Sequence, residues 1–289
     1  MTGQYPFLKV VTRLFLFGFI LTICTTGFSQ SIRLTTWNLR LDIASDSLNQ
    51  WKYRKDEVAR IIRSSGASVI GTQEGFYHQL TDLTSRLPSF GFVGKGRDDG
   101  KKGGEFCAIL FDSMRVTVLQ DSTFWLSQTP DKPVKGWDAA YLRVCTGALF
   151  RDQQSGKSFW VFNLHADNEG ERAREEGSRL VLSAITSLTR SNPDLPVIVM
   201  GDFNATDKAL SVQLLQKRFI DARLATRKKP AGPEGTFNGF RFPFSGGPRI
   251  DYLFVPESAT VLDYLVDDHS VNQRYPSDHF PVTVTLILP

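Results

Sequence analysis

Carboxylates, amides and histidines recur in this sequence at the ends of short apolar runs, which is where functional loops concentrate. Asp202 and Asn204, for example, directly follow the apolar run 197–200. The other members of this pattern are Asn38, Glu74, His165, Asp167, Asp251, Asp278 and His279. Carboxylate and amide oxygens are hard ligands that suit Mg²⁺ or Mn²⁺, whereas zinc is usually held by Cys and His. A metal ion among acidic and basic side chains fits hydrolysis of a phosphate ester by water, and the pattern predicts this chemistry.

Each of these residues also has an ordinary structural explanation. Asn38 could cap a turn, Glu74 could be the acid of a helix first turn, and the segment 201–204 could form an Asx turn. His165 could be a hydrogen-bonded histidine at the end of a strand. The set as a whole favours function, because its members fall at the ends of successive predicted strands.

The elements that must position this set are short strands and a few helices, separated by Gly, Pro, Asp and Ser. Alternating or all-apolar runs predict strands over 32–38, 68–72, 105–111, 123–127, 141–150, 159–164, 197–200, 250–255 and 282–288. Apolar residues at helical spacing predict helices over 51–63, 76–87 and 171–189. Strands outnumber helices, and this favours two packed sheets with helices on their outer faces. No stretch resembles a domain boundary, so we expect a single domain over 31–289.

The first thirty residues are typical of an export signal. Lys9 and Arg13 are basic, the run 14–21 is apolar, and small or polar residues follow it. The apolar run is shorter than the roughly 20 residues that a membrane span needs. We therefore expect a signal peptide over 1–30, no stable membrane span, and a periplasmic or secreted protein. An uncleaved N-terminal anchor is the alternative.

Neither the cysteines nor the net charge excludes a class of function. Cys24 would fit a lipoprotein, but Ile23 before it is bulkier than the usual small residue there. Cys107 and Cys145 lie in apolar strand-like runs, where they would be either paired in an exported protein or buried as free thiols. The formal net charge of +4 over 289 residues neither requires nor excludes nucleic acid as a partner.

Six short strings carry the polar pattern, each at a predicted strand edge. They are Thr36-Trp37-Asn38-Leu39-Arg40, Thr72-Gln73-Glu74, Asn163-Leu164-His165-Ala166-Asp167, Gly201-Asp202-Phe203-Asn204, Arg249-Ile250-Asp251-Tyr252 and Ser277-Asp278-His279. In this order they resemble the endonuclease/exonuclease/phosphatase superfamily, which includes pancreatic-type deoxyribonuclease, AP endonucleases, sphingomyelinases and inositol polyphosphate 5-phosphatases. The resemblance covers 31–289 and implies a four-layer α-β-β-α sandwich, with two packed, mainly antiparallel sheets and outer helices. Further strings within 96–106 and 124–140 resemble an exported bacterial branch related to the deadenylase-type enzymes.

The resemblance implies a metal site and a group that activates water. Glu74 resembles the principal metal carboxylate, with Asn38 as its neighbouring amide ligand or orienter. Asp278 would help to hold the site or a second metal ion, and the cofactor would be Mg²⁺ or Mn²⁺. Asp202 resembles the residue that positions or deprotonates the attacking water.

The remaining motif residues resemble those that handle the phosphoryl group. Asn204 resembles an amide that orients phosphate. His279 and Asp251 resemble the family's His–Asp pair, in which the carboxylate fixes and charges the imidazole. A cationic His279 would then stabilise negative charge that develops on the phosphoryl group. His165 stands where AP endonucleases usually carry tyrosine, and it would contact phosphate or protonate the leaving oxygen.

The substrate is less defined than the metal core. Arg97, Glu105, Arg143 and Arg174 would border the substrate groove, or else form solvated surface salt bridges. A basic patch at 227–229 could meet phosphates, although a solvated charge run is the more common explanation. We favour a phosphodiesterase, either a nuclease or a headgroup phosphodiesterase, over a phosphomonoesterase for a sugar, inositol or lipid phosphate. The intact motif set argues against an inactive binding module, and we expect a monomer whose partner is a phosphate ester, with nucleic acid among the candidates.

Overall fold

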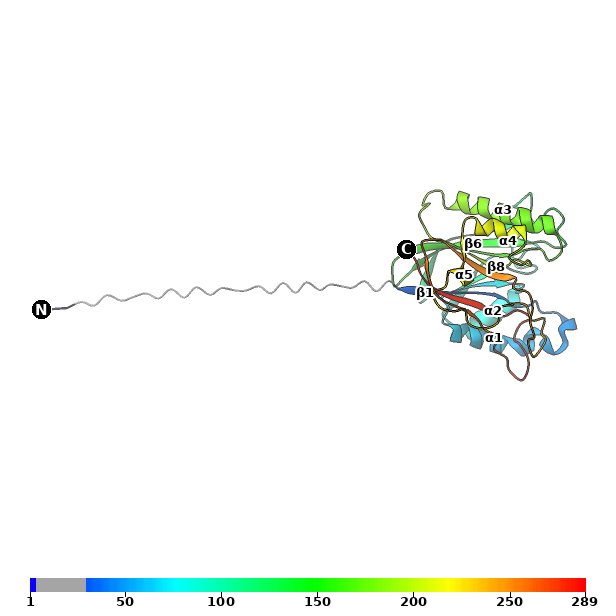
Figure 1. Cartoon of the computed structure of the whole chain (residues 1–289), viewed down its shortest axis with the longest axis horizontal. Coiled ribbons are helices and arrows are strands. Elements are labelled where there is room, and N and C mark those ends of the chain that lie inside the picture. Colours follow the sequence, from blue (N-terminus) through cyan, green and yellow to red (C-terminus); the bar gives the residue numbers. More distant parts are fainter. Residues whose placement is uncertain (4–29) are drawn as a thin grey trace.

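The computed structural model describes residues 1–3 and 30–289, so the signal peptide expected over 1–30 lies almost entirely outside the described residues. Two six-stranded sheets pack face to face, and helices cover their outer sides (Figure 1). This is the four-layer α-β-β-α sandwich that the sequence predicted. Within the described residues, no helix is both long enough and apolar enough to cross a membrane.

The first sheet has one parallel pair of strands at its centre. Its strand order is β11-β12-β1-β2-β4-β3. These strands are β1 (Ser31–Asn38), β2 (Val69–Gln73), β3 (Phe90–Val93), β4 (Ile109–Asp112), β11 (Thr260–Val266) and β12 (Val282–Ile287). Only β1 and β2 run parallel, and their carboxyl ends therefore meet at one edge, where Asn38 lies opposite Gln73.

The second sheet repeats this design. Its strand order is β5-β6-β7-β8-β10-β9, and only β7 and β8 run parallel. These strands are β5 (Val116–Trp125), β6 (Val144–Asp152), β7 (Ser158–His165), β8 (Val197–Asp202), β9 (Ile220–Asp221) and β10 (Asp251–Val255). His165 and Asp202 are paired at the carboxyl ends of β7 and β8, and Asp251 lies opposite Asp202 at the start of β10.

Helices supply the crossovers that parallel pairs require. α1 (Trp51–Ser65) connects β1 to β2, and α3 (Glu171–Leu188) connects β7 to β8. α1 and α2 (Tyr77–Arg86) lie on the outer side of the first sheet, while α3 and α4 (Leu210–Gln216) lie on the outer side of the second (Figure 1). The short helices η1 (Ala44–Asn49) and α5 (Ala222–Ala225) complete the described elements.

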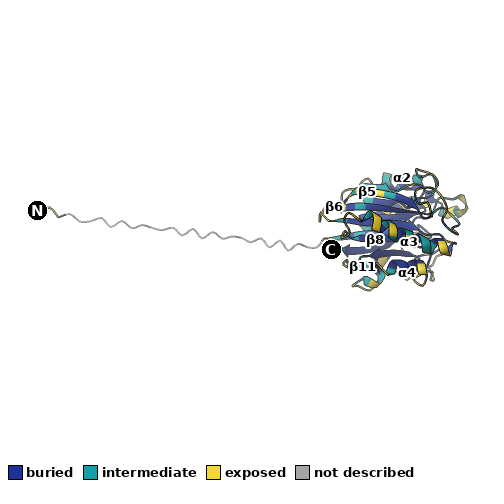
Figure 2. Ribbon diagram, turned by 90° about the horizontal axis from the view of Figure 1, so that it is seen from above, coloured by how far each residue is buried: buried dark blue, intermediate teal, exposed yellow. Residues whose placement is uncertain are grey.

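Three apolar clusters hold the layers together. The central one lies between the sheets and includes Leu34 and Ile198. The outer clusters join α1 and α2 to the first sheet and α3 and α4 to the second. Figure 2 shows the strands as mostly buried and the outer faces of α3 and α4 as exposed. β8 is buried along its whole length because both of its faces are covered, which explains its continuous apolar sequence.

Several expected boundaries differ from the structure. The strand predicted over 105–111 is a continuous strand only as β4, with an isolated bridge between Phe106 and Gly96 before it. The strand predicted over 123–127 is the end of the longer β5. β11 was not predicted, because a bulge between Val261 and Asp263 breaks the alternation of buried residues. β3, β9 and α4 were also missed, since each is too short to show a clear period.

Candidate active site

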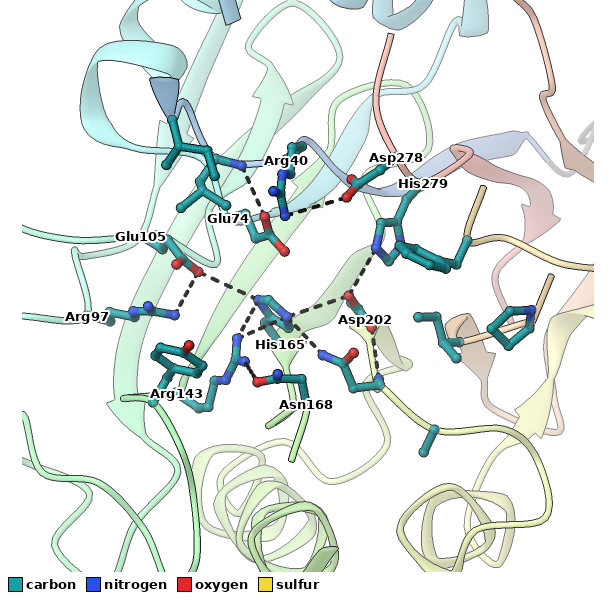
Figure 3. Close-up of a pocket in the computed structure, with 18 of the residues that line it drawn as sticks. Arg40, Glu74, Arg97, Glu105, Arg143, His165, Asn168, Asp202, Asp278 and His279 are labelled. Carbon is teal, nitrogen blue, oxygen red and sulfur yellow. Dashed lines mark hydrogen bonds and ion pairs between the residues drawn. The ribbon is translucent and has the colours of Figure 1, made fainter. Parts of the chain in front are cut away.

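The two parallel pairs place site residues at one end of the sandwich. Asn38 ends β1 and Glu74 follows β2 in the first sheet, whereas His165 and Asp202 end β7 and β8 in the second. The carboxyl ends of both pairs face the same cavity (Figure 3). The fold therefore explains why polar residues recur after apolar runs in the sequence.

A buried amide pair links the two sheets directly beneath this end. Gln73 Nε2 donates to Asn163 Oδ1 at 2.7 Å, and Asn163 Nδ2 donates to the carbonyls of Thr72 and Ala108 at 2.9 Å each. Gly71 makes room for this approach, because a Cβ there would lie 2.8 Å from Asn163 Oδ1. The floor of the site is thus cross-linked from sheet to sheet.

Asp202 is a buried carboxylate at the centre of the site. Its Oδ2 accepts a hydrogen bond from Asn38 Nδ2 at 3.0 Å, and its Oδ1 accepts one from the Asn204 backbone N–H at 2.8 Å. Burial and the nearby charge of Asp251 raise the pKa of Asp202 to about 7. A carboxylate with such a pKa can accept a proton near neutral pH.

His279 and Asp251 form a buried ion pair between the sheets. His279 Nδ1 lies 2.9 Å from Asp251 Oδ2, and its Nε2 lies 3.7 Å from Asp202 Oδ2. Burial alone would lower the pKa of His279, but the charges of Asp251 and Asp202 outweigh it and raise this pKa well above its usual value. His279 is therefore a buried cation at neutral pH.

His165 is a neutral ring at the same site. Burial, together with the charge of Arg143, lowers its pKa well below the usual value. Asn204 Nδ2, which can only donate, lies 3.1 Å from His165 Nε2, and it also donates to the Ala166 carbonyl. Nε2 is accordingly assigned as the hydrogen-bond acceptor of the ring.

Glu74 and Asp278 form an acidic wall of the cavity. Glu74 Oε1 accepts from Asn38 Nδ2 at 2.9 Å, and Oε2 accepts from the Leu41 N–H at 3.1 Å. Asp278 Oδ2 lies 3.7 Å from Arg40 Nη1. Asn38 turns its Oδ1 away from the cavity, toward the backbone N–H of Arg40. Asn38 thus presents its amide nitrogen, not its oxygen, to the carboxylates of Glu74 and Asp202.

Arg97 and Glu105 line the opposite wall. Arg97 Nη1 and Glu105 Oε2 lie 2.7 Å apart, and Arg97 also stacks over the Tyr141 ring at 5.6 Å. Burial raises the pKa of Glu105 to about 7. This wall therefore presents two charged side chains and the Tyr141 hydroxyl to the cavity.

Arg143 and Asp167 support His165. Arg143 Nε donates to Asp167 Oδ2 at 3.2 Å, and Arg143 Nη1 lies 3.0 Å from the His165 ring nitrogens. Asp167 also accepts backbone N–H groups of its own turn and of Ala140, so its role is structural. Arg174 donates to the Asp167 carbonyl at 3.0 Å and is not among the residues that line the cavity.

The cavity has a volume of about 780 Å³. It is lined by most of the residues predicted from the sequence, namely Glu74, Arg97, Glu105, Arg143, His165, Asp202, Asn204, Asp278 and His279. Asn38 and Asp251 lie beneath it and contact Asp202 and His279. The basic patch at 227–229 does not line this cavity, and Lys228 and Lys229 instead border a separate one beside α1 and β11.

The lining residues that were not predicted include Arg40, Tyr141, Asn168 and Phe237. Arg40 is the last residue of one motif string and Asn168 directly follows another, and that position was the only signal available. Phe237 packs edge-on against His279, with ring centroids 5.0 Å apart, and comes from a loop without any pattern.

Backbone strain marks the same region. Arg40, Glu74 and Asn204 have φ values of 56°, 65° and 47°, in the left-handed region that side chains disfavour. Such strain persists where the surrounding structure fixes it, and it clusters at functional sites. The Asx turn considered for Asp202 and Asn204 is present, and it serves to place Asn204 in the cavity.

One buried group has the composition of a metal site. Asp202, Asp251 and His279 offer ligand atoms that all lie within 4.8 Å of one another, but a cationic His279 has no lone pair for a metal ion. The two cysteines within residues 30–289, Cys107 and Cys145, are buried free thiols.

Comparison with known proteins agrees with this geometry. A model of the Endonuclease/Exonuclease/phosphatase family matches residues 35–279. A protein of that family from Bacteroides thetaiotaomicron is 36% identical, with a TM-score of 0.85, over 89% of this chain and 98% of its own. The mannosyl-6-phosphatase of Bacteroides thetaiotaomicron is also 36% identical, with a TM-score of 0.84, over 89% of this chain and 99% of its own. The human Nocturnin catalytic domain with bound sulfate anion is 20% identical, with a TM-score of 0.70 over 90% of this chain and 94% of its own, and it shares the fold.

Proposed function

The chain belongs to the Endonuclease/Exonuclease/phosphatase family of phosphoesterases, and from that membership we propose that it is a Mg²⁺- or Mn²⁺-dependent phosphatase for sugar phosphates. The observation that carries this proposal is a cavity with two kinds of lining. Asp202, His279 and Glu74 form the part suited to a phosphoryl group, and Arg97 and Glu105 line the adjoining wall, where Glu105 Oε2 lies 4.0 Å from His165 Nδ1.

The cavity fits a compact, polar substrate. Its volume of about 780 Å³ is in the range of pockets that enclose most of a small ligand. Arg97, Glu105 and Asn168 can hydrogen-bond to sugar hydroxyls, and Phe237 offers an apolar face for a ring. The similarity to a mannosyl-6-phosphatase supports the same class of substrate.

This proposal replaces the diester preference formed from the sequence. A nucleic-acid groove would need basic residues along its length and exposed aromatic stacking platforms. The basic patch at 227–229 lies apart from the cavity, and Arg97 is already paired with Glu105. A monoester therefore fits this surface better than a polymer.

Asp202 is the proposed general base. It has the raised pKa that a base needs near neutral pH, and Asn38 and the Asn204 N–H hold its two oxygens in place. Water deprotonated by Asp202 would attack the phosphorus from the floor of the cavity, while the bond from phosphorus to the sugar oxygen breaks and that oxygen takes up a proton from solvent.

His279 is the proposed cationic stabiliser of the phosphoryl oxygens. Asp251 fixes its Nδ1, and its Nε2 therefore remains directed toward the centre of the site beside Asp202. Asn204 orients the phosphate together with His165. Because His165 is neutral, it fits contact with the phosphate better than protonation of the leaving oxygen.

Glu74 and Asp278 are the proposed metal ligands. Each Glu74 oxygen accepts one hydrogen bond from the chain, so lone pairs remain for a hard cation, and Asp278 supplies a second carboxylate on the same wall. Asn38 orients Glu74 through its amide nitrogen. When bound, the ion supplies Lewis-acid polarisation of the phosphate.

Export belongs to the same proposal. The basic and apolar pattern of residues 9–21 supports a signal peptide over 1–30 and a periplasmic or secreted enzyme. Edman sequencing of the protein recovered from its native host tests this: a mature N-terminus near residue 31 is expected, and an intact Met1 would refute cleavage.

A substrate panel tests the activity. The purified protein is assayed with mannose 6-phosphate, glucose 6-phosphate, p-nitrophenyl phosphate, bis-p-nitrophenyl phosphate and single-stranded DNA, in Mg²⁺, in Mn²⁺ and after treatment with EDTA. We expect metal-dependent release of phosphate from the sugar phosphates, and none from Asp202→Asn. Hydrolysis of the two diesters without the monoesters would overturn the proposal.

A further inference from the structure

Arg54 of α1 is a buried arginine whose hydrogen bonds go to backbone carbonyls. Only 4% of its surface is exposed, although its guanidinium carries a full charge. It donates four hydrogen bonds, each to a carbonyl oxygen, from three of its nitrogens. A buried charge is retained only where its surroundings satisfy it, so this arrangement needs an explanation.

Three of the four carbonyls belong to the two segments that carry one wall of the active site. Nη1 donates to Leu39 at 2.8 Å and to Pro276 at 2.7 Å, and Nη2 donates to Arg40 at 3.1 Å. Nε donates to the carbonyl of Asn49, the last residue of η1. One guanidinium nitrogen thus joins the chain that leaves β1 to the chain that enters β12.

One of these segments contacts Glu74, and the other contains Asp278, so together they position both carboxylates of the acidic wall. The first continues to Leu41, whose N–H donates to Glu74. The second continues to Asp278, which faces Arg40, and then to His279. If one segment moved relative to the other, the distances between Glu74 and Asp278 and between Glu74 and His279 would therefore both change.

The planar fork of arginine suits this task. Five N–H donors in a rigid plane can reach several carbonyls in different directions, whereas a lysine ammonium is a compact point charge. The guanidinium also lies 5.4 Å from the Trp51 ring and 5.6 Å from the Phe240 ring, and these contacts fix its plane. A second link between the same segments is the Ser277 hydroxyl, which donates to the Asn38 carbonyl at 2.6 Å.

We propose that Arg54 is a positioning residue, which sets the distance between the segments 39–41 and 276–279 and thereby the geometry of the catalytic wall. The expected fall in kcat rests on the proposed function, whereas the expected change in the spacing of the two segments does not. A displacement of about 1 Å in reacting groups can cost about 100-fold in rate, so a rate effect without loss of folding is expected.

The test compares Arg54→Lys with Arg63→Lys. Arg63 lies on the same helix and also donates to a backbone carbonyl, that of Arg86, but at the surface and away from the cavity. Kinetics with mannose 6-phosphate are measured at a temperature where circular dichroism shows both variants to be folded. We expect kcat to fall at least about 10-fold in Arg54→Lys, with KM changed less than about 3-fold, and no change in Arg63→Lys.

Hydrogen exchange supplies a readout that does not depend on activity. Backbone amides of residues 39–41 and 277–279 should exchange faster in Arg54→Lys than in the wild type, while those of α3 should not. Ser277→Ala, which removes the second link, should raise exchange in the same segments and provides the test if Arg54→Lys does not fold.

Wild-type kcat in folded Arg54→Lys, or unchanged exchange in both segments, would overturn the inference. A loss of kcat that only follows a loss of folded protein would overturn it as well. A wild-type protein that hydrolyses no phosphate ester would refute the proposed function, and hydrogen exchange would then decide the role of Arg54 alone.

Discussion

His279 and Asp251 lie 2.9 Å apart, from Nδ1 to Oδ2, although they come from different sheets. His279 precedes β12 of the first sheet, and Asp251 begins β10 of the second. The ion pair therefore depends on the packing of the sandwich, and the catalytic centre is complete only when both sheets are in place.

The first prediction concerns this pair. Asp251→Asn removes the charge that raises the pKa of His279, so a smaller fraction of the ring is cationic at pH 7. We expect kcat to fall by about 10²–10³-fold, as for loss of a group that stabilises charge in the transition state. Asp251→Asn combined with His279→Gln should be little worse than either single change, because residues that act as a unit are not additive. Independent, multiplicative losses would contradict the pairing.

The second prediction concerns the metal. Glu74→Gln removes a carboxylate from the acidic wall and should weaken Mn²⁺ binding at least about 10-fold by isothermal titration calorimetry. Glu105→Gln is the matched control, since Glu105 lines the same cavity but pairs with Arg97. Equal loss of affinity in both variants would argue against a metal site at Glu74.

The third prediction separates sugar recognition from phosphate chemistry. Arg97→Met should raise KM for mannose 6-phosphate by about 10-fold, which is the loss of roughly one charged hydrogen bond. KM for p-nitrophenyl phosphate should change less, because that substrate has no hydroxyls for this wall. Arg190→Met, an exposed change after α3, should affect neither value. The same rise for both substrates would place Arg97 at the phosphate instead.

The fourth prediction concerns two glycines with opposite outcomes. Gly201 has φ of 148°, and a Cβ there would lie 2.0 Å from the Leu164 carbonyl oxygen, so Gly201→Ala should prevent β8 from pairing with β7. Gly177 lies within α3 with its nearest neighbour at 3.6 Å, so Gly177→Ala should stabilise the protein by about 0.4–1 kcal/mol. Thermal unfolding of both variants measures the contrast, and a tolerated Gly201→Ala would contradict the close approach of the strands.

The fifth prediction concerns stability against pH. Burial acts to raise the pKa of Asp152, but hydrogen bonds from Arg115 and Ser155 outweigh it and hold this pKa below its usual value. The carboxylate therefore adds stability above the unfolded-state pKa of about 3.9, and this contribution is lost as the pH falls through the lower folded-state pKa. Asp152→Asn should lower the free energy of unfolding at pH 7 by about 1.5–3 kcal/mol, with a difference that shrinks below pH 4. A difference that stays constant with pH would contradict this.

The residues at strand ends were predictable because the parallel pairs obey a simple rule. The apolar sequence of β8 and the polar residues after it indicate a buried strand followed by a functional loop. Asp202, Asn204, His165 and Glu74 were found in this way. The rule works because the carboxyl ends of parallel strands must meet at one edge.

Residues on loops escaped the same reasoning. Phe237 and Tyr141 reach the cavity through turns whose course depends on contacts far away in the sequence, such as the bridge between Phe237 and His279. Arg54 could not be predicted for a different reason. Its partners are backbone carbonyls, which every residue has, so the sequence does not indicate them. Neither kind of contact has a sequence signature.

The hydrogen bond between Gln73 and Asn163 has a mechanical consequence. It pins the two sheets to each other at the catalytic end, so sliding one sheet by a residue would bury unpaired amides. The floor of the cavity should behave as one rigid body, without a hinge between its halves. Adaptation to new substrates would then proceed through the rim loops, while the reacting centre keeps its dimensions.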